Sequence, residues 1–170
     1  MSALPTFQQA MAISAERIGL WDAGELSDEV LADEMGQLVS HRDGARGFFV
    51  VSLTADSPLM DRLPEALVSQ LRQAGMGVVD LTVRNYLMST AMAVHHRRQQ
   101  DQSMLEGSLR VRGRSLDLLA QLDPYLLKEK LDSLMEGLNG EGEEKDFFDR
   151  WNYDDEQRKE IKAAILSVAE

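Results

Sequence analysis

The side chains best able to recognise a charged ligand gather in the middle of the chain. Residues 84–114 contain six arginines, no lysine and two acids, which gives this segment a net charge of +4. A guanidinium group can form two parallel hydrogen bonds with a carboxylate or a phosphate, so the exclusive use of arginine favours anion recognition. The candidate binding residues of this segment are Arg84, His95, His96, Arg97, Arg98, Arg110, Arg112 and Arg114.

Three interpretations of these arginines remain open. Arg97 and Arg98 fall in the last turn of a predicted helix, where cations stabilise the negative end of the helix dipole. That position does not explain Arg110, Arg112 and Arg114. The arginines can pair with the acidic ends of the same chain, since residues 1–50 and 139–170 each carry a net charge of −5. Alternatively, they form a docking surface for an acidic protein partner, or they bind phosphate, including that of nucleic acid.

The adjacent pair His95 and His96 lacks the neighbours that a metal site requires. Metal ligands on one helix face stand three or four residues apart. At these distances from either histidine the chain has only alanine, methionine, arginine and glutamine. The third histidine, His41, is far away in sequence. We therefore predict no metal site.

Known catalytic and cofactor-binding motifs are missing from the sequence. The P-loop, the G-x-S-x-G pattern and the calcium-binding loop are absent, and Gly75-Met76-Gly77 lacks the third glycine of a dinucleotide fingerprint. The chain has no cysteine, which excludes thiolate metal sites and cysteine nucleophiles. The sequence therefore favours a protein that is not an enzyme and holds no cofactor.

An aromatic cluster near the C-terminus is a second candidate for recognition. Phe147, Phe148, Trp151 and Tyr153 follow a tract of glycine and glutamate. The cluster either anchors the last helix on the body of the protein, which is the stronger expectation, or recognises another protein. Trp151 completes the set of candidate binding residues.

Nine methionines raise the alternative of an adaptable binding groove. They include Met76, Met88, Met92 and Met104, which stand in predicted helices rich in leucine and valine. In such helices we expect methionine mainly to fill the core.

The overall charge limits the classes of partner. The formal net charge is −11, so the average surface repels nucleic acid and anionic lipid. No apolar run approaches the length of a membrane span, and the N-terminus lacks the pattern of a secretory signal. We expect a cytoplasmic protein that does not bind membranes, and we disfavour nucleic acid as a ligand.

Helical patterns dominate the elements that must position these residues. Ser27, Asp123 and Asp154 are predicted N-caps, with Pro124 at a first helical position and Gln157 three residues after Asp154. The longest apolar stripe predicts a central, well-buried helix at 78–98, with Leu87 in the core. The other predicted helices cover residues 7–24, 27–38, 57–75, 104–122, 124–138 and 154–168. In the helix at 104–122 the apolar side is formed by Leu105, Leu109, Leu116 and Leu119.

The resulting fold is predicted to be all-α, an irregular bundle of about six or seven helices. Residues 47–54 and 77–83 are apolar and rich in β-branched residues, so two short strands in an α+β fold are the minor alternative. We expect a helical core domain at 1–138, an acidic Gly/Glu linker at 139–146, and a C-terminal helix at 147–170 led by the aromatic cluster and docked on the core.

The sequence thus favours a non-enzymatic interaction or regulatory protein. Its expected recognition surfaces are the arginine-rich helical segment, which suits an acidic protein partner, and the aromatic C-terminal segment. The alternatives are an enzyme or anion-binding protein whose site is assembled from distant residues, and a nucleic-acid-binding protein. Self-association into a homo-oligomer stays open.

Overall fold

Helices form all the regular structure of residues 3–169, the part of the chain that the computed structural model describes. Nine α-helices and one short 3₁₀ helix are present in this range and no strand, which confirms the predicted all-α class. In chain order the elements are α1 (Phe7–Asp22), α2 (Asp28–Leu38), α3 (Arg42–Thr54), the 3₁₀ helix η1 (Pro58–Asp61), α4 (Glu65–Gln73), α5 (Met76–Arg98), α6 (Gln102–Leu119), α7 (Pro124–Leu138), α8 (Lys145–Trp151) and α9 (Asp155–Ala169).

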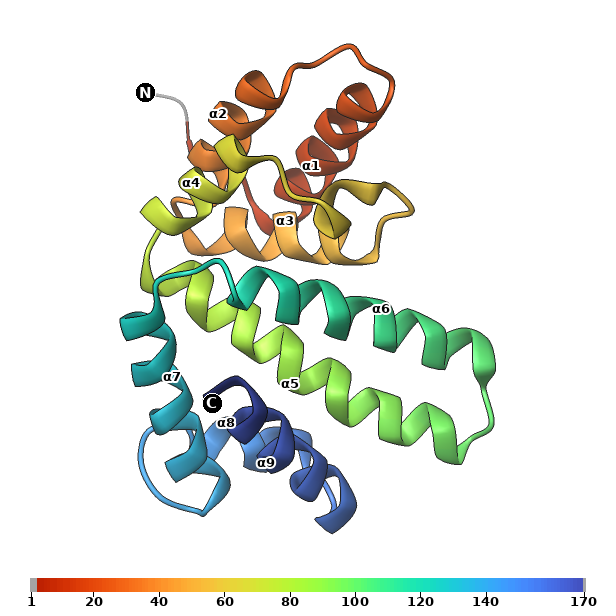
Figure 1. Ribbon diagram of the computed structural model, residues 1–170, viewed down its shortest axis with the longest axis vertical. Helices are drawn as coiled ribbons and strands as arrows, with labels where there is room; N and C mark the ends of the chain where they lie inside the picture. Colours follow the sequence, from red (N-terminus) through yellow and green to blue (C-terminus); the bar gives the residue numbers. More distant parts are fainter. Residues whose placement is uncertain (1–2, 170) are drawn as a thin grey trace.

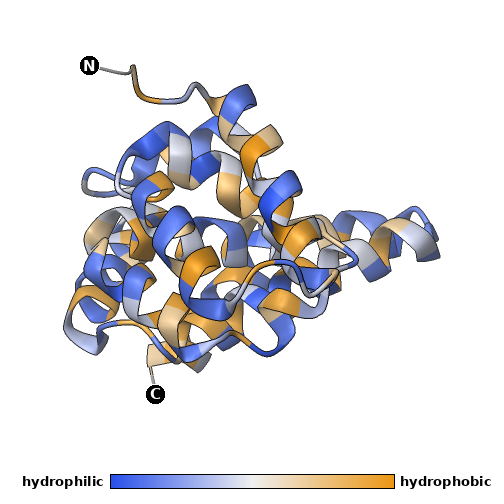
Figure 2. Ribbon diagram, turned by 90° about the horizontal axis from the view of Figure 1, so that it is seen from above, coloured by the Kyte–Doolittle hydropathy of each residue, from blue (hydrophilic) through white to orange (hydrophobic). Residues whose placement is uncertain are grey.

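The antiparallel pair α5 and α6 runs across the middle of the molecule (Figure 1). Helices α1–α4 lie on one side of this pair and α7–α9 lie on the other. Helix α5 packs against α3, α6, α7 and α9, as expected for the predicted central helix, and its Leu87 is fully buried. The far end of the α5–α6 pair projects beyond the rest of the protein (Figure 2).

The predicted helix starts are confirmed by their capping hydrogen bonds. The Ser27 side chain accepts a hydrogen bond from the Val30 N–H, and the Asp123 carboxylate accepts from the N–H groups that follow Pro124. Asp154 and Gln157 exchange two hydrogen bonds between side chain and backbone, which is the reciprocal pattern of a capping box. These caps pair N–H groups that the first turn of a helix leaves without partners.

The alternative of two short strands is wrong, because residues 47–54 belong to α3 and residues 77–83 to α5. Phe48, Phe49 and Leu53 of α3 are buried in the core. Helix α1 approaches α3 so closely that a Cβ atom on Gly47 would stand 2.5 Å from the Ala10 side chain. A helix over 42–54 thus buries the same apolar residues that suggested a strand.

The C-terminal segment departs from its prediction in two ways. The predicted linker is shorter, because α8 begins at Lys145, and the predicted single helix is two helices separated at Asn152, whose φ is +49°. The Gly/Glu tract also packs against α7, where a Cβ atom on Gly137 would meet the Glu144 carbonyl carbon at 2.6 Å. Phe148 of α8 and Ile161 of α9 are fully buried in the main core.

The helix count is therefore higher than the expected six or seven. Helix α8 and α3 account for the difference, because α8 was predicted as the start of a single helix at 147–170 and the segment of α3 had a strand as its minor alternative. No helix among residues 3–169 combines the length and hydrophobicity needed to cross a membrane.

Candidate functional site

Four of the six arginines in residues 84–114 pair with acids that are distant in sequence. Arg97 and Arg112 form no ion pair within residues 3–169. The partners of Arg84 and Arg98 lie in the C-terminal segment and those of Arg110 and Arg114 lie between α3 and α4, so the candidate arginines do not share one partner region. The four pairs are Arg84 with Glu144, Arg98 with Asp154, Arg110 with Asp56, and Arg114 with Asp61.

Arg114 is buried and closes the C-terminal end of α3. Its Nε and Nη2 donate hydrogen bonds to the Asp61 carboxylate at 2.9 and 3.1 Å. Its Nη1 donates to the Ala55 carbonyl at 2.7 Å and, at longer distances, to the Ser52 and Leu53 carbonyls. The hydrogen bond from Arg114 lowers the pKa of the Asp61 carboxyl. Arg114 therefore has a structural role, because the last carbonyls of α3 lack partners within their own helix.

Arg84 belongs to a closed ring of four charges that joins α5, α7 and the segment before α8. Arg84 donates to Asp80 at 2.9 Å and to Glu144 at 2.7 Å, and the Lys130 ammonium lies 3.0 Å from Asp80 and 3.2 Å from Glu144. The four side chains are only 11–22% exposed. The Arg84 guanidinium also lies over the Phe147 ring, 4.8 Å from its centroid. The ring of four charges therefore holds the C-terminal helices on α5.

The electrostatics of this ring favour the charged forms of its members. Burial alone would raise the pKa of Asp80, but hydrogen bonds and charges of Arg84 and Lys130 outweigh it and hold that pKa below its ordinary value. Burial alone would lower the pKa of Lys130, but Asp80 and Glu144 outweigh it and raise that pKa. A group with a lowered folded-state pKa adds stability above its unfolded-state pKa and loses it as the pH falls.

We therefore expect a defined pH dependence for the Asp80 contribution. The difference in unfolding free energy between wild type and Asp80→Asn should stay constant from neutral pH down to about pH 4, the ordinary range of an aspartate, and shrink below it. Urea unfolding at a series of pH values measures this difference. Asp132→Asn is the control, because Asp132 forms an exposed pair with Lys128 on α7. A difference for Asp80→Asn that is unchanged at pH 3 would contradict the proposed stabilisation of the carboxylate.

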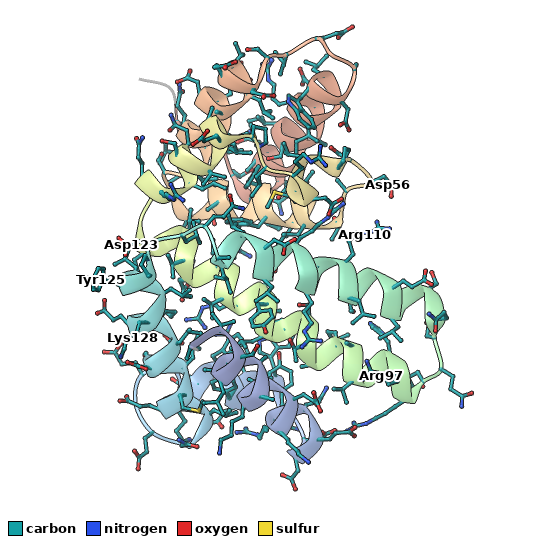
Figure 3. The ribbon with its side chains drawn as sticks, in the orientation of Figure 1. Asp56, Arg97, Arg110, Asp123, Tyr125 and Lys128 are labelled. Atoms are coloured by element: carbon teal, nitrogen blue, oxygen red, sulfur yellow. The ribbon has the colours of Figure 1, made fainter. Side chains whose placement is uncertain are left out.

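The basic tetrad at the end of α5 is divided among three environments. Arg98 pairs with Asp154 and Glu156 at the start of α9, and its hydrogen bond lowers the pKa of Asp154 to about 2. His95 is exposed, whereas His96 is buried. Arg97 lies near the projecting end of α5 (Figure 3). Because Arg84 is about three helical turns away, it does not form a site with the histidines.

A largely apolar groove runs along the α5–α6 pair. It has a volume of about 350 Å³ and is lined by Met88 and Met92 of α5 and by Met104, Gly107 and Val111 of α6. Thr54, the last residue of α3, also lines it. Pockets that bind ligands start at about 300 Å³ and are mostly apolar with a few polar groups.

The expectation that the methionines mainly fill the core holds for Met35 and Met60, which are buried, and for Met76, which packs against the core, but it is wrong for Met92 and Met104. Met92 is 40% exposed and Met104 is 52% exposed. Met92 belongs to α5 and Met104 to α6, and both line the groove. Their exposure matches the alternative of an adaptable binding surface, because methionine is flexible and polarisable.

Arg110 is the one charged residue among those that line the groove. Its Nη1 lies 3.5 Å from the Oδ1 of Asp56, whose side chain is fully exposed (Figure 3). Exposed pairs of this kind stabilise a protein by no more than about 1 kcal/mol, so Arg110 is free to exchange its partner. Arg112 is half-buried and lies outside the groove.

Trp151 extends the surface at the other end of the groove. It is 47% exposed and shares a second hollow with Met88, so Met88 separates the two depressions. This second hollow also contains Arg42 and Arg150 together with Glu143 and Asp146, which leaves it without a dominant charge. The remaining aromatic residues of the cluster are inside: Phe148 and Tyr153 are buried and Phe147 packs against the core.

The described residues contain no group of three or more histidine, aspartate or glutamate side chains placed to hold a metal ion. Of the candidate binding residues selected from the sequence, only Arg110 lines the groove, while Met88, Met92 and Met104 belong to the alternative of an adaptable methionine groove. The signal for the groove in the sequence was the spacing of Met88 and Met92, which stand four residues apart on one helix. This spacing does not reveal whether the two side chains are exposed.

Comparison with known proteins gives a family but no described function. No curated protein and no solved structure matches the chain. A family model with the description "Uncharacterised conserved protein UCP020893" matches residues 6–168, which is nearly the whole length of the chain. The chain belongs to this family.

Proposed function

We propose that the protein is a non-enzymatic interaction protein that binds an amphipathic helix with acidic flanks, supplied by a partner protein, in the groove of α5 and α6. The observation that carries the proposal is the methionine-lined groove with Arg110 as its one lining charge. Large exposed apolar side chains gathered in one concave surface are typical of interaction sites.

The groove favours a helical occupant over the other common forms of bound segment. Addition of a strand needs an exposed sheet edge, and residues 3–169 contain no strand. Proline-rich segments dock in grooves lined by aromatic rings, and no aromatic residue lines this groove. A groove between two helices takes the apolar face of a third helix, as in other complexes of amphipathic helices.

The dimensions of the groove fit two turns of a partner helix. Asn85 and Met92, which line the α5 wall, stand seven positions apart, or about 10 Å at the rise of an α-helix. Apolar side chains at positions i, i+4 and i+7 of a partner helix span the same length. The small lining residues Ser89, Gly107 and Ser108 leave the floor open for such side chains.

The charge distribution selects acidic flanks on the partner. The chain carries a net charge of −11. The acids that pair with Arg84, Arg98 and Arg114 neutralise them, so the positive charge left on the α5–α6 pair comes from Arg97, Arg112 and the weakly paired Arg110. An acidic partner is therefore repelled by both ends of the chain and steered toward the α5–α6 pair. Arg110 at the edge of the groove can then replace its weak contact with Asp56 by a pair with a partner carboxylate.

Reversing the charge of Arg110 should weaken this binding. We expect Arg110→Glu to raise the Kd of a synthetic amphipathic peptide, with leucine at i, i+4 and i+7 and glutamate on both flanks, by roughly tenfold, or about 1.4 kcal/mol. Fluorescence anisotropy of the labelled peptide at physiological ionic strength measures the Kd. The same peptide with lysine in place of the flanking glutamates should bind Arg110→Glu more tightly than it binds wild type.

Arg112→Glu is the matched control, because it makes the same change in net charge two residues further along α6 but outside the groove. Its effect on the Kd should be less than about twofold, since only the long-range field changes. Equal effects of the two reversals would show that the peptide responds to the net charge and would contradict docking in the groove.

A further inference from the structure

A separate small pocket lies at the turn between α5 and α6. It has a volume of about 230 Å³ and is lined by His96, Arg97, Gln100, Asp101, Gln102 and Leu105. None of these residues lines the methionine groove. The pocket therefore needs its own explanation.

His96 contributes a buried polar side chain without a partner. Only 8% of the residue is exposed, and neither ring nitrogen forms a hydrogen bond within the described part of the chain. Its nearest aromatic neighbour is His95, at 5.3 Å between ring centroids. Neither nitrogen is among the fully enclosed polar atoms that lack a partner, so the ring of this nine-tenths buried residue is open to the pocket that it lines. A polar group so enclosed usually has a hydrogen-bond partner, and a ligand in the pocket would supply one.

The rest of the lining supplies donors suited to an anion. Arg97 carries a guanidinium that forms no ion pair among the described residues, and Gln100 and Gln102 carry amide groups. The pocket lies at the N-terminus of α6, an 18-residue helix. Unpaired N–H groups and the positive end of the helix dipole make such a terminus favourable for negative charge.

Asp101 is the one acid in the lining, and its carboxylate is already engaged. It caps α6 by accepting a hydrogen bond from the Met104 N–H at 3.1 Å. The first two N–H groups of the helix, those of Gln102 and Ser103, are left without this cap. The charge of Asp101 lowers the affinity for an anion without removing the donors.

We propose that this pocket binds a single oxyanion group, a phosphate or a carboxylate, between His96, Arg97 and the N-terminus of α6. Imidazole and guanidinium donate to its oxygens from the α5 side, and the α6 N–H groups donate from the other, while the Gln102 side-chain amide donates to Glu106 at 3.3 Å. The size of the pocket suits one such group. The site is independent of the groove, because the two share no lining residue.

The test uses inorganic phosphate as the probe and the full chain as the protein. Titration at constant ionic strength, followed by ¹H–¹⁵N correlation spectra, should shift the amides of Arg97, Gln102 and Ser103 in a saturable way, with a Kd on the order of millimolar. Acetate and phosphoserine in parallel titrations show whether the site takes a carboxylate or a phosphorylated side chain. Absence of saturable shifts at these residues with all three probes would overturn the proposal.

Two substitutions locate the site. His96→Gln and Arg97→Gln should each raise the Kd at least fivefold, and Arg97→Gln is expected to fold normally because Arg97 is exposed. Arg112 also forms no ion pair, but it lies elsewhere on the same pair of helices. Arg112→Gln should therefore leave the Kd unchanged. Equal loss of affinity in Arg112→Gln and Arg97→Gln would contradict a defined site at the turn.

Discussion

Replacing Arg114 with methionine is expected to lower the free energy of unfolding by about 3–5 kcal/mol. The substitution keeps a long apolar side chain but removes the guanidinium that donates to Asp61 and to the carbonyls at the end of α3. The Ser52 and Leu53 residues are buried, so water has little access to replace those hydrogen bonds. Most of the cost comes from buried acceptors left without a donor, because Asp61 itself is half exposed.

Urea unfolding of wild type and Arg114→Met measures this loss. Arg112→Met is the matched control on the same helix, and its effect should remain within about 0.5 kcal/mol because Arg112 forms no ion pair. Arg114→Lys should recover only part of the loss, since an ammonium cannot reproduce the fork of donors. A loss below about 1 kcal/mol for Arg114→Met would mean that the end of α3 does not depend on this side chain.

Local signals were sufficient to predict most of the helices. The start of α7 was correct to the residue because Asp123 and Pro124 combine a cap with a residue suited to the first turn. The central position of α5 followed from its broad apolar stripe, which includes Leu87. These features depend on neighbours in sequence, which is why spacing alone reveals them.

Contacts between segments that are distant in sequence could not be predicted from local patterns. Leucine spacing predicted that Leu109 and Leu116 form the apolar side of α6, but both are 39% exposed, and Arg114 and Ser115 are buried instead. The helix is turned so that Arg114 reaches the end of α3. A charged residue that is buried by a partner some 60 positions away leaves no periodic signal.

The Gly/Glu tract illustrates the same difficulty. It contains no apolar side chain and was therefore predicted to be a linker, yet Glu144 is buried by Arg84 and Lys130. The methionine groove was only the minor alternative for a related reason. Met92 and Met104 occupy helix positions compatible with a core, yet they are 40% and 52% exposed.

A large side chain placed in the groove should abolish binding of the glutamate-flanked leucine peptide and leave the fold intact. In Gly107→Leu the new side chain enters open space, since a Cβ atom at Gly107 has no neighbour within 4 Å. The substitution also replaces a glycine inside a helix, which should raise stability by up to about 1 kcal/mol. The leucine side chain then occupies the space between Met104 and Val111 that the partner helix requires.

Gly113→Leu provides a matched control on the same helix. Gly113 also has open space at its Cβ position, but it does not line the groove. Both variants should therefore gain similar stability, as measured by urea unfolding. Only their affinity for the peptide should differ.

The most direct test of groove docking is the Kd of the glutamate-flanked leucine peptide for wild type, Gly107→Leu and Gly113→Leu. Fluorescence anisotropy should show affinity for wild type and Gly113→Leu that agrees within about twofold, and a loss of at least tenfold for Gly107→Leu, or about 1.4 kcal/mol. Equal affinity of the two leucine variants, with both folded, would contradict the groove of α5 and α6 as the docking site.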